Sequence, residues 1–195
     1  MLILAFDTAT DLATSALVAD GVTLGERTTR PQSLLADVAD LLAAAQRVPA
    51  DLTAIVVGTG PGSFTGTRIG LSVARGLALS LDLPVAGVST LDALAASAEG
   101  VFPIIDARRG EVFVPGPFAV RPEDVVFPSG SICIGDGACR YRELLTQRGA
   151  DVPPDDSLLH VPRASLHVSL ATAFGPGDAV EPVYVREPDA EKWAR

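Results

Sequence analysis

The sequence has few of the residue types that most often carry out catalysis. Its 195 residues include two cysteines, two histidines and one tryptophan, and aromatic residues make up 5%. Cys133 and Cys139 fit no metal-binding or redox spacing, so we interpret them as thiols buried in a reducing compartment. His160 and His167 have no closely flanking carboxylate, and we interpret them as surface or packing residues. We therefore predict no catalytic residue and no metal site.

Basic tracts and long hydrophobic runs are missing as well. The net charge is −9, whereas a protein that grips nucleic acid needs lysines and arginines to neutralise phosphates. We therefore expect no direct, tight nucleic-acid binding by the chain alone. The first apolar run stops at Asp7 without a basic leader, and no segment reaches membrane-spanning length. We expect a cytoplasmic protein that makes no membrane contact.

Apolar residues, in contrast, make up 48% of the chain, which is enough for a sizeable core. Short apolar runs predict strands, and the turn Asp20-Gly21 joins two of them. The predicted strands of the first half are 2–8, 13–20, 22–29, 53–58 and 84–89. Helical spacing predicts helices over 34–46, with Ser33 as N-cap, and over 66–82. Ser89 and Asp92 form a capping-box pattern before a third helix over 89–98. This order indicates a layered α/β fold.

The pattern restarts after Gly100. The segment 101–116 gives a strand that ends in Asp, a polar turn and a second strand, as residues 2–18 do. A strand at 132–135 and a helix near 138–148 follow, with proline-rich connections. We predict a duplicated unit whose second copy is reduced, with domains at 1–98 and 99–195.

A glycine-rich turn, GTGPGSFTGTRIG, occupies residues 58–70 between a predicted strand and a predicted helix. It lacks the lysine of a phosphate-binding Walker loop and the spacing of a dinucleotide fingerprint, and Pro61 replaces the glycine of a nucleophile elbow. A helix N-terminus attracts anions without a motif, but nothing here makes that specific.

The helix after this turn is small or apolar around most of its circumference. Every fourth residue from Gly62 to Ala78 is glycine or alanine. A glycine inside a helix costs about 1 kcal/mol relative to alanine, and close backbone packing offsets that cost. Either the chain's own helix at 34–46 covers this surface or another protein does, and the few charges of both helices favour a partner.

Asp7 and Asp106 end the first strand of each half. In sugar kinases, actin and related ATPases, this position in each half touches nucleotide phosphate or metal. Thr8 and Thr10 stand in the first turn where glycines often occur. These four residues are weak nucleotide-binding candidates, and simple turn capping by the two aspartates is an equal alternative.

Six stretches together resemble the TsaB (YeaZ) family: ILAFDTAT, GTGPGSFTGTRIGLSVARGLA, GVSTLDALA, IDARRGEVF, IGDGA and EPVYVR. The likeness runs from residue 3 to about 186, and GPGSFTGTRIG is its most specific part. The resemblance implies an actin/sugar-kinase/Hsp70-like (ASKHA, ribonuclease H-like) fold. It also implies a non-catalytic subunit of the complex that installs threonylcarbamoyl on adenosine 37 of tRNAs. Older catalogues place the family among glycoproteases of peptidase family M22.

The resemblance further implies that the helices at 34–46 and 66–82 form the pairing face. The partners would be a catalytic threonylcarbamoyltransferase subunit (TsaD-like) and an ATPase subunit (TsaE-like), with a homodimer when the chain is alone. ATP or ADP is expected only at the interface with the partner. We expect Gly70→Glu to block pairing while the monomer stays folded. The residues assigned to this interface are Gly62, Phe64, Gly66, Arg68, Gly70, Ala74, Leu35, Val38 and Leu42.

The sequence departs from the family pattern in two places that affect the predicted function. Catalytic relatives carry a His-x-x-x-His metal pair that is missing from residues 31–42, and Gln32 stands where TsaB proteins often keep a histidine. The chain is also short after EVFVPG, so part of the usual second domain is missing. The alternative functions are a small nucleotide-binding hydrolase or kinase of the same fold and, least favoured, a peptidase.

Overall fold

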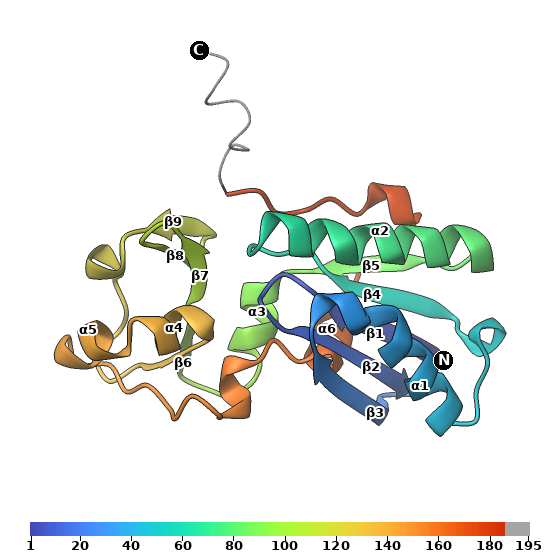
Figure 1. The fold of residues 1–195 in the computed structure, drawn as a ribbon, viewed down its shortest axis with the longest axis horizontal. Helices are drawn as coiled ribbons and strands as arrows, with labels where there is room; N and C mark the ends of the chain where they lie inside the picture. Colours follow the sequence, from blue (N-terminus) through green and yellow to red (C-terminus); the bar gives the residue numbers. More distant parts are fainter. Residues whose placement is uncertain (186–195) are drawn as a thin grey trace, which may run out of the picture.

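A computed structural model describes residues 1–185. The first lobe is built on a five-stranded sheet with strand order β3-β2-β1-β4-β5 (Figure 1). Strands β1 to β3 form an antiparallel meander, while β4 and β5 run parallel to β1. This is the ribonuclease H-like topology, and it confirms the predicted fold class. The strands are β1 (Leu2–Asp7), β2 (Ala13–Ala19), β3 (Val22–Thr29), β4 (Ala54–Gly58) and β5 (Val85–Val88).

Helices cover both faces of this sheet because the side chains of β1 alternate between two hydrophobic clusters. Leu4 and Phe6 pack with helices α1 (Leu34–Ala44) and α2 (Phe64–Leu81). Ile3 and Ala5 pack on the opposite face with α6 (Ala164–Leu170). The first strand is therefore buried on both faces, as its continuous apolar run predicts.

Two of the helices begin at a serine that caps them, as the sequence pattern indicates. Ser63 caps α2 by accepting a hydrogen bond from the Gly66 N–H at 3.2 Å, and Ser89 caps α3 (Thr90–Ala95) in the same way. Ser33 stands at the predicted N-cap of α1, but its side chain makes no capping bond. The reason is the 3-10 turn η1 (Pro31–Ser33), which gives Ser33 helical dihedral angles.

The second lobe is smaller, and its strands form two separate sheets. The antiparallel sheet repeats the meander of the first lobe with β7 (Ile105–Arg108), β8 (Glu111–Val114) and β9 (Phe118–Val120). The predicted strand that starts at Val101 and ends in Asp106 is wrong in its bounds, because it is divided between two sheets and Asp106 lies within β7. The parallel pair is β6 (Val101–Pro103) with β10 (Ile132–Ile134), and the helices are α4 (Asp136–Arg140) and α5 (Arg142–Gln147). Its core includes Ile104, Val112 and Leu145.

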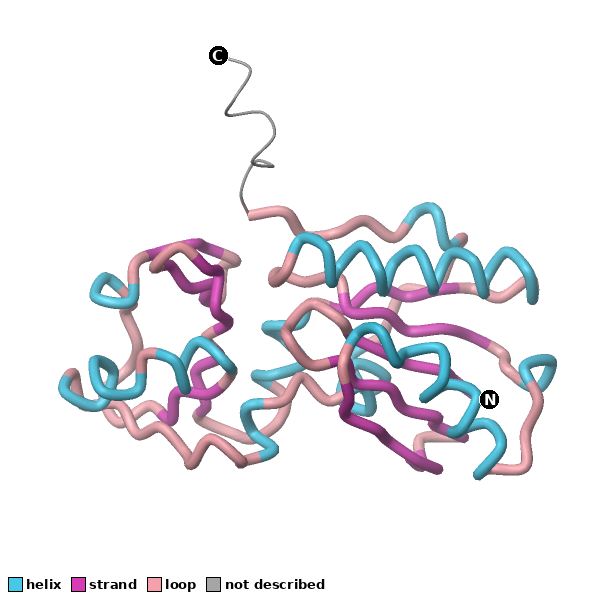
Figure 2. The backbone as a smooth tube through the Cα atoms, viewed as in Figure 1, coloured by secondary structure: helices cyan, strands magenta, loops and turns pink. Residues whose placement is uncertain are grey.

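The C-terminal part of the chain returns to the first lobe. Helix α6 lies against β1 and β2, and Gly175 pairs with Val85 in an antiparallel bridge. The following segment, with the turn η5 (Gly177–Ala179), runs along α2 (Figures 1 and 2). The predicted boundary between 98 and 99 stays a prediction, but residues 164–180 pack with the first sheet. Residues 186–195, which include Arg186 of the EPVYVR motif, lie outside the described residues.

Within residues 1–185, no helix is both long enough and apolar enough to cross a membrane.

Candidate functional site

The glycines of the turn at 58–70 pack against their own chain. A methyl group added at Gly70 would lie 2.6 Å from Thr8 Oγ1, and one added at Gly62 or Gly66 would meet the backbone of the turn after β1. The Thr8 hydroxyl also donates to the Gly66 carbonyl at 2.7 Å. The inference of close backbone approach is therefore correct, but the expected second helix is wrong, because the opposing group is the turn at 8–10.

The interface residues assigned from sequence divide into two groups. Gly66, Gly70, Ala74, Val38 and Leu42 are buried within the first lobe, because these faces of α1 and α2 cover the chain's own sheet. The chain itself covers them in this conformation, and a side chain at Gly70 would collide with Thr8, so Gly70→Glu would disrupt packing rather than test pairing. Leu35, Phe64 and Arg68 are exposed, and Gly62 is half-buried. Gly76 is also exposed with open space beside it, so no packing accounts for it.

Asp7 is buried, and its carboxylate is fully engaged inside the protein. Oδ1 accepts from the Ala9 N–H at 2.6 Å, and Oδ2 accepts from Thr90 Oγ1 at 2.7 Å and from His167 Nε2 at 2.8 Å. Burial raises the pKa of Asp7, but the hydrogen bonds and charge of His167, with Thr90 and Ala9, outweigh it and hold the pKa below its usual value.

His167 is the main residue whose contact the sequence did not reveal. It is fully buried on α6, and its Nδ1 lies 3.0 Å from the Arg163 carbonyl oxygen. Both ring nitrogens thus face oxygen acceptors, so His167 holds the Asp7 carboxylate against α6. His160 fits the packing interpretation, since its Nδ1 accepts from the Gly135 N–H and its Nε2 faces the Pro153 carbonyl, each at 3.0 Å.

The remaining nucleotide candidates of the first turn are also engaged internally. Thr8 bonds to Gly66, and the Thr10 hydroxyl bonds to the Leu12 backbone. The side-chain alternation of β1 directs Asp7 towards α6 and Thr8 towards α2, which explains how neighbouring residues reach opposite faces. The turn after β1 therefore connects the layers of the first lobe.

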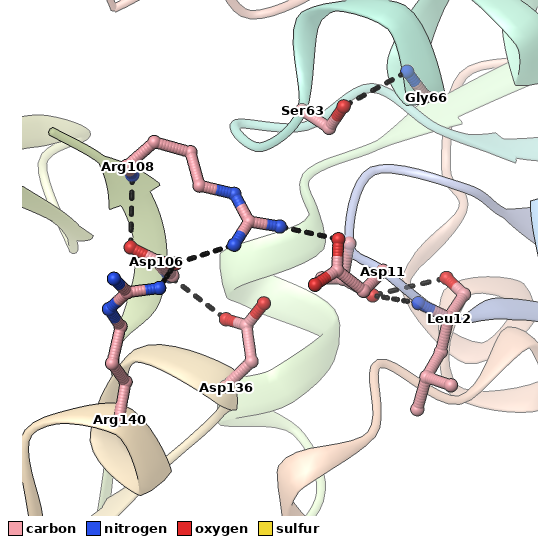
Figure 3. A network of polar contacts seen from close by, with 9 residues as sticks. Asp11, Leu12, Ser63, Gly66, Asp106, Arg108, Asp136 and Arg140 are labelled. Atoms are coloured by element: carbon pink, nitrogen blue, oxygen red, sulfur yellow. Dashed lines mark hydrogen bonds and ion pairs between the residues drawn. The ribbon is translucent and has the colours of Figure 1, made fainter.

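Asp106 lies in a polar network between the lobes (Figure 3). Its carboxylate accepts from the Arg108 N–H at 2.9 Å, from the Arg108 guanidinium at 3.0 Å and from Arg140 at 3.1 Å. Arg108 also bonds to Asp11 of the first lobe, so a single guanidinium bridges the two lobes. Arg108 has a φ of 61°, a backbone conformation that is uncommon outside glycine.

Asp136 completes this network by accepting from the Asp106 N–H at 2.9 Å. Burial, with repulsion from Asp106 and Asp11, raises the pKa of Asp136 to about 6. Asp136 belongs to the IGDGA motif and Asp11 to the first turn, but the sequence alone did not show that Asp136 meets Asp106 or that Asp11 meets Arg108.

Within residues 1–185, no group of three histidine, cysteine or acidic side chains is placed to hold a metal ion. Burial raises the pKa of the Cys133 and Cys139 thiols to about 11, which keeps them protonated at neutral pH. Exposed apolar side chains, Leu35 of α1 with Phe64 and Leu79 of α2, make the outer surface of these two helices and the C-terminal segment on α2 the candidate functional site.

The fold and this site define a two-lobed, ribonuclease H-like protein with a reduced second lobe. Residues 31–148 match the family described as TsaD, tRNA N6-adenosine threonylcarbamoyltransferase. The chain is also similar to YeaZ from Pseudomonas aeruginosa, with a TM-score of 0.80 and 32% identity over 94% of this chain and 99% of that one. The chain belongs to the TsaB/YeaZ family.

Curated relatives agree with this assignment. The chain is 43% identical over 123 residues to the tRNA threonylcarbamoyladenosine biosynthesis protein TsaB of Escherichia coli (strain K12), which covers 58% of this chain and 53% of that protein. It is 35% identical over 209 residues to the uncharacterized protein Rv3421c of Mycobacterium tuberculosis (strain ATCC 25618 / H37Rv). That match covers 98% of this chain and 95% of the relative. The matches to TsaB thus span about half the length of those proteins.

Proposed function

We propose that this chain is the non-catalytic partner subunit of the complex that installs threonylcarbamoyl on adenosine 37 of tRNAs. The similarity to proteins named for tRNA threonylcarbamoyladenosine biosynthesis carries this proposal. The chain would act by pairing with the TsaD-like catalytic subunit. A TsaE-like ATPase would join this pair, and the free chain would form a homodimer.

The polar residues at the strand ends support a non-catalytic role. A carboxylate that is to hold a metal or orient a phosphate needs lone pairs free for the ligand. Both oxygens of Asp7 already accept hydrogen bonds, from Ala9, Thr90 and His167, and both oxygens of Asp106 accept from Arg108 or Arg140, which leaves each carboxylate little capacity for a ligand. These contacts count against a stand-alone kinase or hydrolase.

The outer faces of α1 and α2 support a pairing role. Leu35 of α1 is 59% exposed, Phe64 of α2 is 41% exposed and Leu79 of α2 is 88% exposed. Because the buried residues of both helices already cover the sheet, these apolar side chains remain for contact with a second protein.

Co-expression with a tagged TsaD-like subunit of the same organism tests the proposal. We expect a 1:1 complex by size-exclusion chromatography with light scattering. Leu35→Glu should weaken it by at least tenfold while the thermal unfolding temperature stays unchanged. Val126→Glu is the matched control, because Val126 is 85% exposed in the second lobe. A wild-type chain that never co-purifies with the catalytic subunit would refute the proposal.

Depletion of the chain in its native cells tests the reaction itself. Mass spectrometry of tRNA nucleosides should show loss of threonylcarbamoyladenosine and recovery with the wild-type gene. We propose no cofactor for the free chain, so calorimetric titration with ATP should give no heat. Micromolar ATP binding that Asp7→Ala abolishes would instead favour the kinase or hydrolase alternative.

A further inference from the structure

The C-terminal segment is fixed onto α2 by specific polar contacts. Arg75 of α2 donates to the Gly177 carbonyl at 3.3 Å and to the Val180 carbonyl at 2.7 Å. Further along, the Val183 N–H donates to the Thr59 carbonyl at 2.8 Å. These bonds bring Tyr184 to the N-terminal end of α2, next to residues more than a hundred positions earlier in the chain.

Three side chains meet at that point. The Arg68 guanidinium carbon lies 3.6 Å from the centre of the Phe64 ring, which is a close cation–π contact. Arg68 Nε donates to the Tyr184 hydroxyl at 2.9 Å. The rings of Phe64 and Tyr184 lie 5.4 Å apart. Each of the three side chains is thus held by the other two.

The side chains of this cluster contact one another but remain exposed to solvent. Phe64 is 41% exposed, Tyr184 is 46% exposed, and Arg68 is also exposed. Tyrosine and arginine are enriched among the residues that dominate binding energy, and a side chain already held in place loses little freedom on binding. Exposed aromatic rings fixed in advance are typical of a contact surface.

The charge around the cluster indicates what it would bind. Residues 64–81 contain Arg68 and Arg75 but no acidic residue, although the chain carries a net charge of −9. A hollow of about 580 Å³ beside them is lined by Arg68, Leu71, Ser72, Arg75, Glu181, Pro182 and Tyr184. The lining holds two arginines and one carboxylate, Glu181, and the terminal nitrogens of Arg68 make no hydrogen bond within the described part of the chain, so a carboxylate of the partner is the ligand that suits them.

We propose that Phe64, Arg68 and Tyr184 form one preorganised anchor for a protein partner that presents a carboxylate beside an apolar side chain. The proposal rests on the proposed function, with the catalytic subunit as that partner, and it adds the C-terminal segment to the pairing surface. The carboxylate bonds the free edge of the Arg68 guanidinium, and the apolar side chain packs on the two rings.

Binding affinities of full-length variants for the purified catalytic subunit test the anchor. Arg68→Ala should raise Kd about 30-fold or more. Arg68→Lys should raise it about tenfold, since lysine keeps the charge but loses the planar stacking and the bond to Tyr184. Tyr184→Phe should raise Kd about threefold through loss of the hydroxyl alone. Phe118→Ala is the matched control, because Phe118 is 60% exposed on the second lobe, and its Kd should stay within twofold.

Two further measurements separate this proposal from its alternatives. Unfolding temperatures of all four variants should match that of the wild type, which shows that affinity loss is not loss of fold. The wild-type association rate should fall with added salt more steeply than that of Arg68→Ala. If the wild type binds and Arg68→Ala binds as tightly, the anchor is refuted while the proposed function stands. If the wild type does not bind at all, the proposed function itself fails.

Discussion

The turns that follow β1 and β7 share a sequence pattern, an aspartate followed by a short polar segment, but they have different structural roles. Each strand ends near an aspartate, yet Asp7 is buried among Thr90, His167 and the Ala9 backbone, whereas Asp106 bonds two exposed arginines. The first turn holds the layers of one lobe together, and the second connects the lobes through Arg108 and Asp11. The comparison teaches that a repeated motif fixes where a carboxylate stands, while distant residues decide what it does.

Removal of the Asp7 carboxylate should have the largest effect. Asp7→Ala leaves the buried His167 ring and Thr90 hydroxyl without their shared acceptor, and the lost hydrogen bonds to a buried carboxylate together cost about 3–5 kcal/mol of unfolding free energy. Urea denaturation followed by circular dichroism measures the loss. The double variant with His167→Leu should recover part of the stability. A cost for Asp7→Ala smaller than that for Asp106→Ala would contradict the comparison.

The pH dependence of stability should depend on Asp136. Its pKa of about 6 lies above the ordinary value of 3.8, so the folded state binds this proton more tightly than the unfolded state. The resulting stabilisation is complete below about pH 4 and is lost as the pH rises through 6, which amounts to roughly 2–3 kcal/mol.

Asp136→Asn removes this titration. It should be more stable than the wild type at pH 7.5 and equally stable at pH 4 in denaturant titrations. The exposed Asp178 offers the control variant Asp178→Asn, which should show no such pH-dependent difference. Equal stabilities of Asp136→Asn and the wild type across this range would show that Asp136 does not carry the effect.

Asp106→Asn should have a moderate effect of about 1–2 kcal/mol. Its two arginine partners are more than half exposed, so solvent screens the lost attraction, but the hydrogen bonds to a buried carboxylate are weakened. The same denaturation assay measures it. A loss as large as that of Asp7→Ala would mean that solvent does not screen the network between the lobes. That network would then contribute as much to the free energy of unfolding as the hydrogen bonds of Asp7.

The bridge between the lobes should contribute least. Asp11→Asn breaks an ion pair whose side chains are 70% and 51% exposed, and such pairs contribute about 0–1 kcal/mol. The loss should shrink further in 0.5 M salt, as denaturation at two salt concentrations will show. A salt-independent loss above this range would indicate that Arg108 and Asp11 are coupled to the buried carboxylates.

The sequence predicted the elements of the first lobe well because they depend on local signals. Continuous apolar runs identified β1 and β4, and helical spacing identified α1 and α2 to within a few residues. The sequence showed the row of small residues on α2, but it did not show which segment of the protein that row faces. Spacing shows that one face is small, while only the fold shows that the turn at 8–10 lies against it.

The candidate site was predicted less well because it depends on contacts between distant positions. His167 meets Asp7 across 160 residues, and Arg68 meets Tyr184 across 116. The spacing of apolar residues along the sequence carries no information about such distant pairs. Phe64 and Arg68 were assigned to the interface and are exposed, whereas Val38 and Leu42 were assigned to it and are buried, because an apolar stripe marks the face towards the core.

The packing of α6 against β1 has a consequence for how the protein folds during synthesis on the ribosome. The strand made first, Leu2–Asp7, acquires the covering of one face only when residues 164–170 have emerged. Until then its sheet has an open apolar surface and lacks the partner of Asp7, so the N-terminal lobe completes its folding last.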